Sequence, residues 1–95
     1  MEHEIKFESN QNRFYISNNN NETIAEVTFK PVNENIIILY HTYVDISLRG
    51  QGIAKILVDK VVDYARLNNL KIKPTCSYAL KIMTHSSSYQ DVLIN

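Results

Sequence analysis

Apolar and polar residues alternate along the first half of the chain with a period of two, which is typical of β-strands. This pattern predicts strands over residues 4–9, 13–17 and 24–29, with Pro31 ending the third. Asn-rich segments separate the strands and predict turns. A fourth run, residues 36–44, is continuously apolar and aromatic, which favours a central strand buried on both faces. The first half is therefore expected to form an antiparallel meander.

The period changes to that of a helix after Gly52. Apolar residues recur three and four positions apart over residues 54–65, and charged residues occupy the other side of the same stretch. Two asparagines, residues 68–69, offer a left-handed end to this helix. The remaining elements are a short strand over 70–75, a second helix over 77–84 and a last helical turn or packed tail over 89–94. A strand, a helix and a strand in this order imply a parallel pair.

Composition narrows the class of protein. The 95 residues are expected to form a single domain, residues 1–95. A formal charge of zero argues against a general nucleic-acid or membrane-surface binder. No apolar run approaches the roughly 20 residues needed to span a bilayer, and the charged N-terminus lacks the apolar core of a signal peptide. The single cysteine rules out an internal disulfide and suits a reducing compartment, so a cytoplasmic location is expected.

The only two glycines of the chain lie in one segment, Arg49-Gly50-Gln51-Gly52-Ile53-Ala54, between the fourth strand and the first helix. Turns elsewhere use Asn, which still carries a side chain, so glycine here suggests that another group approaches the backbone closely. Amides at a helix N-terminus are unpaired and bind phosphate. The alternative is a turn that only starts the helix, and the spacing alone does not separate these two interpretations.

In this context the glycine segment resembles the signature of the GNAT superfamily of acyl-CoA-dependent N-acetyltransferases. That signature is Gln/Arg-x-x-Gly-x-Gly/Ala, and Arg49, Gly52 and Ala54 match each of its fixed positions. The order of meander, long strand, glycine segment, amphipathic helix, short strand and short helix is also similar. Cys-Ser-Tyr-Ala at residues 76–79 resembles the Asn-x-x-Ala of many members. The short chain looks like a minimal, single-domain subfamily.

The resemblance implies an α+β fold: a GNAT-like mixed, mostly antiparallel sheet with a splayed central parallel pair and two main helices. It also implies acetyl-CoA as the ligand. The backbone of Tyr43 and Val44 is then expected to pair with the pantetheine arm as an added strand. The pyrophosphate is expected on the amides of Arg49, Gly50, Gln51, Gly52, Ile53 and Ala54. A dinucleotide-binding fingerprint fits less well, because Lys55 stands where it needs glycine or alanine.

The chain departs from the larger members of this family. They carry two helices between the first strands and two strands after the last helix, for which this chain has no room, and those helices help build the acceptor site. Many members also place a Tyr near the last helix as general acid, and Met83 stands at that position. Because methionine cannot donate a proton, cofactor binding carries over more directly than catalysis.

Two residues are candidates for catalysis. Cys76 lies between a predicted strand and a helix, where its thiolate is favoured, so it could accept the acetyl group or protonate the departing coenzyme thiolate. The alternative is a small buried residue without chemistry. His41 shares a strand face with Tyr43 and could be a base for the amine or a partner for Cys76. Its alternative is a half-buried, hydrogen-bonded histidine.

The other candidate side chains point to less specific roles. Arg49 could bind a phosphate or only pack beside the turn. The histidines and Cys76 lack the usual zinc-ligand spacing, so no metal site is expected. The tyrosines assigned to the core or to the wall of a cleft are Tyr40, Tyr43, Tyr64 and Tyr78.

The sequence favours an acetyl-CoA-binding, N-acetyltransferase-like protein that transfers acetyl to an unknown amine or protein acceptor, directly or through Cys76. The alternative is a non-catalytic acyl-CoA-binding or sensor module. A monomer or weak homodimer is expected.

Overall fold

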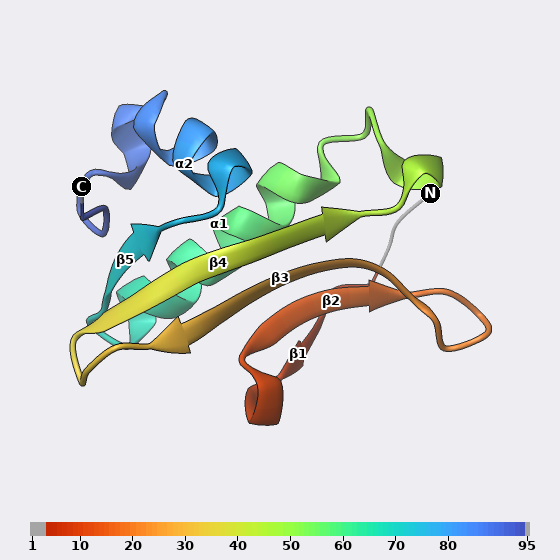
Figure 1. Cartoon of the computed structure of the whole chain (residues 1–95), viewed down its shortest axis with the longest axis horizontal. Coiled ribbons are helices and arrows are strands. Elements are labelled where there is room, and N and C mark those ends of the chain that lie inside the picture. The colour runs from red at the N-terminus through yellow and green to blue at the C-terminus, as the bar shows by residue number, and fades with distance from the viewer. Residues whose placement is uncertain (1–3, 95) are drawn as a thin grey trace.

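The computed structural model describes residues 4–94 and shows a sheet with helices packed against it (Figure 1). Within this part of the chain the strands lie side by side in the order β1-β2-β3-β4-β5. The strands are β1 (Lys6–Glu8), β2 (Arg13–Ser17), β3 (Thr23–Pro31), β4 (Ile36–Val44) and β5 (Lys71–Pro74). The α-helices are α1 (Ile53–Leu67) and α2 (Ser77–Thr84), and the 3-10 turns are η1 (Ser9–Gln11), η2 (Ile46–Leu48) and η3 (Ser87–Tyr89). No described helix is both long and apolar enough to cross a membrane.

The first four strands form the predicted antiparallel meander, and the fold class is confirmed. The predicted bounds of β2, β4 and α2 agree with the structure, whereas β1 is shorter and β3 longer than predicted. Three asparagines, Asn12, Asn21 and Asn69, adopt positive φ angles of 50°, 63° and 57°. Asn tolerates this left-handed backbone, which explains how a chain with two glycines makes its turns.

Helix α1 packs across one face of the sheet and buries its apolar stripe there. The buried residues of this stripe are Ile53, Leu57, Val58, Val61, Val62 and Ala65. They meet alternate residues of β3, Ala25, Val27 and Phe29, which are also buried. Tyr64 adds an aromatic contact, with its ring centroid 5.1 Å from that of Phe29. The core forms where the helical and strand periodicities coincide, and α2 extends it with Ala79 and Met83.

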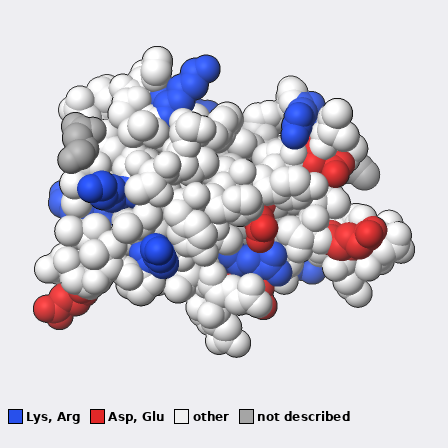
Figure 2. Space-filling view, viewed as in Figure 1, with Lys and Arg blue, Asp and Glu red and all other residues white. Residues whose placement is uncertain are grey.

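Strand β4 is not buried on both faces, contrary to the prediction. Ile37 and Leu39 are buried, but Tyr40 is 46% exposed and His41 is exposed as well. A shift of register between Thr28 and Phe29 leaves Tyr40 as an extra residue on β4, as in a β-bulge. In Figure 1 α1 lies behind the sheet, and Figure 2, from the same side, shows the face away from α1 with scattered charges of both signs. Because only one face is covered by α1, the run of apolar and aromatic residues includes solvent-exposed positions.

The parallel pair of β4 and β5 separates after a few residues. Pairing runs from Ile36 opposite Lys71 to Leu39 opposite Pro74. The amides of Thr75 and Cys76 then both donate to the Leu39 carbonyl, at 3.0 and 3.3 Å, before the chain enters α2. Within residues 4–94, β4 continues from Leu39 to Val44 with no strand paired to it on the side of β5. This is the divergence expected for the central pair.

The end of the chain forms both a short turn and a packed tail. After η3, Leu93 makes an isolated parallel bridge to Ile72 of β5. The Ile72 amide donates to the Val92 carbonyl at 2.6 Å, and the Ile94 amide donates to the Ile72 carbonyl at 2.9 Å. Arg66 of α1 donates to both carboxylate oxygens of Asp91, at 2.8 and 2.9 Å. The tail therefore lies along the outer edge of β5 and is tied to α1.

Candidate functional site

The segment between β4 and α1 begins with a capped 3-10 turn. Asp45 accepts hydrogen bonds from the amide and the hydroxyl of Ser47, at 3.0 and 2.6 Å. These bonds lower the pKa of the Asp45 carboxyl, so it stays ionised and caps η2. Arg49 ends η2, and its side-chain Nε donates to the Val44 carbonyl at 3.3 Å. The turn thereby fixes where the glycine segment begins.

Both glycines adopt a backbone that other residues avoid. The φ angle is +85° at Gly50 and +73° at Gly52. A Cβ built on either residue would meet no atom within 4 Å. Glycine is therefore favoured here by the left-handed backbone rather than by close protein packing. Gly52 is the N-cap of α1, which agrees with the predicted start of this helix.

The amides that follow have no hydrogen-bond acceptor among the described residues. Within residues 4–94, the N–H groups of residues 50–55 make no hydrogen bond, and the first bond of α1 runs from the Ile56 amide to the Gly52 carbonyl at 3.1 Å. Unpaired amides at a helix N-terminus carry partial positive charge. The Arg49 guanidinium adds a full positive charge beside them. This end of α1 therefore favours an anion such as a phosphate.

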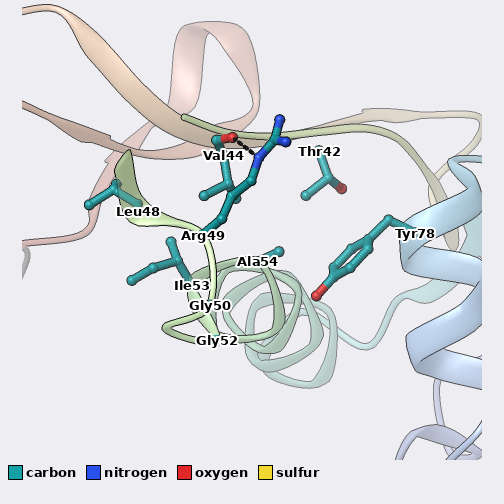
Figure 3. A pocket seen from close by; sticks show the side chains of 9 residues that line it. All are labelled: Thr42, Val44, Leu48, Arg49, Gly50, Gly52, Ile53, Ala54 and Tyr78. Carbon is teal, nitrogen blue, oxygen red and sulfur yellow. Dashed lines mark hydrogen bonds between the residues drawn. The ribbon is translucent and has the colours of Figure 1, made fainter. Parts of the chain in front are cut away.

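A cavity of about 320 Å³ opens beside these amides (Figure 3). Its walls come from β4, the β4–α1 segment, α1 and α2, through Thr42, Val44, Leu48, Arg49, Gly50, Gly52, Ile53, Ala54 and Tyr78. The structure thus brings most of the predicted cofactor-binding residues around one cavity. Gln51 is exposed and does not line it. An anion-favouring end and apolar walls together suit an elongated ligand with a charged group at one end.

The backbone groups that face the cavity belong to Thr42 and Val44. The Asp45 amide donates to the Ile24 carbonyl of β3, and hydrogen-bonded pairs alternate along an antiparallel ladder. Tyr43, opposite Glu26, therefore directs its N–H and C=O toward β3. Thr42 and Val44, on either side of Tyr43, direct their N–H and C=O groups toward the gap beside β5. This differs from the expectation that the Tyr43 backbone is free to pair with a ligand.

Cys76 lies where β5 gives way to α2, as the sequence predicted, and it is the N-cap of that helix. Its Sγ lies 3.5 Å from the Thr42 hydroxyl. Partial burial would raise the pKa of the Cys76 thiol, but hydrogen bonds from Thr42 and from the amides of Ala79 and Tyr78 outweigh it and lower the pKa. Cys76 therefore ionises more readily than an ordinary cysteine, and it lies next to the end of the cavity that is lined by Thr42.

His41 lies on the open face of the sheet. Its Nε2 is 3.5 Å from Oε2 of Glu26, whose other oxygen accepts from Arg13 at 2.9 Å. The next residue, Thr42, points the other way and contacts Cys76. The structure therefore does not bring His41 and Cys76 together.

Sequence reasoning did not assign three of the lining residues to the site. Thr42 could have been found because it shares a strand face with Val44. Tyr78 follows Cys76 by two residues. It was expected in the core or in a cleft wall, and it lines the cavity. Leu48 offered no signal, because its position depends on η2. Of the other tyrosines, Tyr64 is in the core, but Tyr40 and Tyr43 are exposed on the open face.

No group of three or more His, Cys, Asp or Glu residues within 4–94 is arranged to hold a metal ion.

Comparison with known proteins gives consistent matches. The sequence model of the family described as GCN5-related N-acetyl-transferase matches residues 13–92. Protein NATD1 of Gallus gallus is 30% identical over 78 residues, which are 82% of this chain and 71% of that protein. The solution structure of a GCN5-like protein from Staphylococcus aureus is 43% identical, with a TM-score of 0.82 over 97% of this chain and 88% of the other.

A more distant structure shares the fold. This is a GNAT family acetyltransferase from Elizabethkingia anophelis with acetyl-CoA bound, which is 18% identical with a TM-score of 0.59. The match covers 77% of this chain and 50% of that protein.

Proposed function

Because the chain belongs to the GCN5-related N-acetyltransferase family, we propose that it binds acetyl-CoA in the cavity beside α1 and transfers the acetyl group to an amine. One observation carries this proposal: within residues 4–94 the amides of residues 50–55 make no hydrogen bond, and four of these residues, Gly50, Gly52, Ile53 and Ala54, line a cavity of about 320 Å³. The charged pyrophosphate and the thin, largely apolar arm of coenzyme A match these two parts of the site.

Each part of the site has a role in this proposal. The amides of residues 50–54 and the guanidinium of Arg49 hold the pyrophosphate. The gap-facing backbone groups of Thr42 and Val44 hydrogen-bond the pantetheine arm as a neighbouring strand would. The thioester then lies near Thr42, where Cys76 is within 3.5 Å of the threonine hydroxyl. Acetyl-CoA supplies an activated acyl group at this position.

Cys76 has two possible parts in the chemistry. If an amine attacks the thioester carbonyl directly, the Cys76 S–H gives its proton to the departing coenzyme thiolate. In the covalent route, the Cys76 thiolate attacks the carbonyl carbon, a new C–S bond forms to Sγ, and the C–S bond to the coenzyme breaks. The lowered pKa of the thiol supports the covalent route, because the thiolate is the nucleophile.

His41 is the candidate base for an amine that approaches from the open face of the sheet, where Glu26 lies beside it. In this role, the His41 imidazole takes the proton of the attacking amine. A flat pH–rate profile between pH 5 and 8 would argue against it.

Binding is tested first, by titrating the amide NMR spectrum with acetyl-CoA and with free coenzyme A. We expect shifts concentrated at residues 42–44, at 50–55 and around Cys76. Absence of shifts at millimolar ligand would mean that the glycine segment is a structural turn, and the proposal would fall.

Turnover is tested next, with a panel of amines. Consumption of thioester above the uncatalysed rate supports the enzyme, and loss of protein acetylation in Cys76→Ser supports the covalent route. Buried Met83, which cannot serve as an acid, favours the second candidate, a non-catalytic acyl-CoA-binding or sensor module. Binding without turnover would select that candidate.

A further inference from the structure

One side chain from α2 lines the end of the cavity away from the glycine segment. Of the described residues that line the cavity, Tyr78 alone comes from α2 and alone is aromatic. In Figure 3 its ring extends from α2 toward α1 with the hydroxyl directed toward Ala54, while Leu48 and the glycines lie at the other end. Tyr78 therefore forms the wall of the cavity at the end nearest α2.

The ring is placed beside the reactive groups of the proposed site. Thr42 lines the same end of the cavity, and its hydroxyl is the group that contacts the Cys76 sulfur. Tyr78 is 41% exposed, and its hydroxyl makes no hydrogen bond to any residue within 4–94. Its side chain thus belongs to the cavity surface rather than to the buried core.

From this arrangement we propose that Tyr78 limits the transferable acyl group to acetyl. The inference rests on the proposed binding of acetyl-CoA, with the pyrophosphate at the glycine segment and the thioester near Thr42. A chain that continues beyond the thioester carbonyl then runs toward the Tyr78 ring. Acetyl ends before the ring, whereas propionyl or butyryl must displace it, and inserting methylenes into filled space is unfavourable.

The test compares the binding of acetyl-CoA, butyryl-CoA and free coenzyme A to the whole chain by calorimetry. The unmodified protein is expected to bind acetyl-CoA roughly tenfold more tightly than butyryl-CoA. Tyr78→Ala should reduce this preference to about threefold or less, because the wall is removed. Tyr78→Phe should retain the preference, since the ring remains. Leu80→Ala is the matched control, because Leu80 is 44% exposed on the same helix and does not line the cavity.

The outcomes separate this inference from the proposed function. Equal affinity of the unmodified protein for acetyl-CoA and butyryl-CoA would overturn the role of Tyr78 and leave acetyl-CoA binding intact. An unchanged preference in Tyr78→Ala would do the same. If no coenzyme A derivative binds, the proposed function itself fails. Tyr78→Leu provides a side chain of intermediate size. A preference for acetyl-CoA that falls from Tyr to Leu to Ala would support the role of Tyr78 as the wall.

Discussion

The thiol of Cys76 depends on a small number of neighbours for its lowered pKa. Replacing the hydroxyl in Thr42→Val keeps the shape of the side chain but removes a hydrogen bond that favours the thiolate. The midpoint of thiol alkylation by iodoacetamide, followed against pH, should therefore move to higher pH. Thr84→Val is the control, because the Thr84 hydroxyl bonds to the Leu80 carbonyl at the far end of α2. An unchanged midpoint in Thr42→Val would contradict this account.

Gly52 tests whether backbone conformation alone requires a glycine. Its φ of +73° disfavours any residue with a Cβ, although a Cβ would meet no neighbouring atom. Gly52→Ala should lower the free energy of unfolding by about 1–2 kcal/mol. Gly52→Asn should lose less, because Asn69 already adopts a similar φ of 57° at the end of α1. Urea unfolding measures both, and an alanine variant as stable as the original protein would refute the explanation.

Helix α1 holds the site in place through its buried stripe, and its stability should follow burial. Leu57 is fully buried against the sheet, so Leu57→Ala should cost about 2–5 kcal/mol of unfolding free energy. Leu67, in the last turn, is 83% exposed, and Leu67→Ala should change stability by no more than about 0.5 kcal/mol. Thermal or denaturant unfolding of the two variants compares the same substitution on one helix. Similar losses in both would mean that the stripe is not the source of stability.

The elements show why the sequence predicted some features and not others. The bounds of β2, β4 and α2 follow from local properties, namely runs of apolar residues and the turn residues between them. The bulge at Tyr40 depends on how β4 pairs with β3, so a continuous apolar run suggested burial on both faces when only one is covered. Strand register likewise decides that Thr42, rather than Tyr43, turns its backbone to the cavity.

The candidate site also has one part that local sequence predicts and another part that depends on tertiary structure. The glycine segment is contiguous in sequence, and its helix N-terminus could be predicted from a single motif. The opposite wall comes from α2, whose position against α1 is a tertiary property, so the sequence could assign Tyr78 only to the core or to a cleft wall. The separation of His41 from Cys76 also needed the structure, because two residues on neighbouring elements can face opposite sides of a sheet.

At the scale of the whole molecule, the tail is joined to α1 by a bond that depends on pH. The hydrogen bond from Arg66 lowers the pKa of the Asp91 carboxyl. The carboxylate therefore stabilises tail docking above its ordinary pKa, and this contribution is lost as the pH falls through the lowered value. Protection of the Ile72 and Ile94 amides against hydrogen exchange should fall over that acidic range.

Matched variants separate the effect of the Arg66–Asp91 hydrogen bond from other effects of low pH on the protein. Asp91→Asn should reduce protection of the Ile72 and Ile94 amides several-fold at neutral pH and remove most of its acid dependence. Asp63→Asn is the control, because Asp63 lies 4.0 Å from Arg66 and on α1 itself. Equal protection in the Asp91 variant would show that the tail is held by its apolar residues alone.

The tail also has a consequence for self-association. An uncovered edge strand exposes backbone donors and acceptors that can pair with another chain, which is a common start of aggregation. Here the last residues occupy the Ile72 amide and carbonyl of β5, while the opposite edge, β1, is short and carries Lys6 and Glu8. Seven residues, 88–94, would thus act as a cap against polymerisation. A chain cut before Ser88 should therefore form edge-to-edge oligomers.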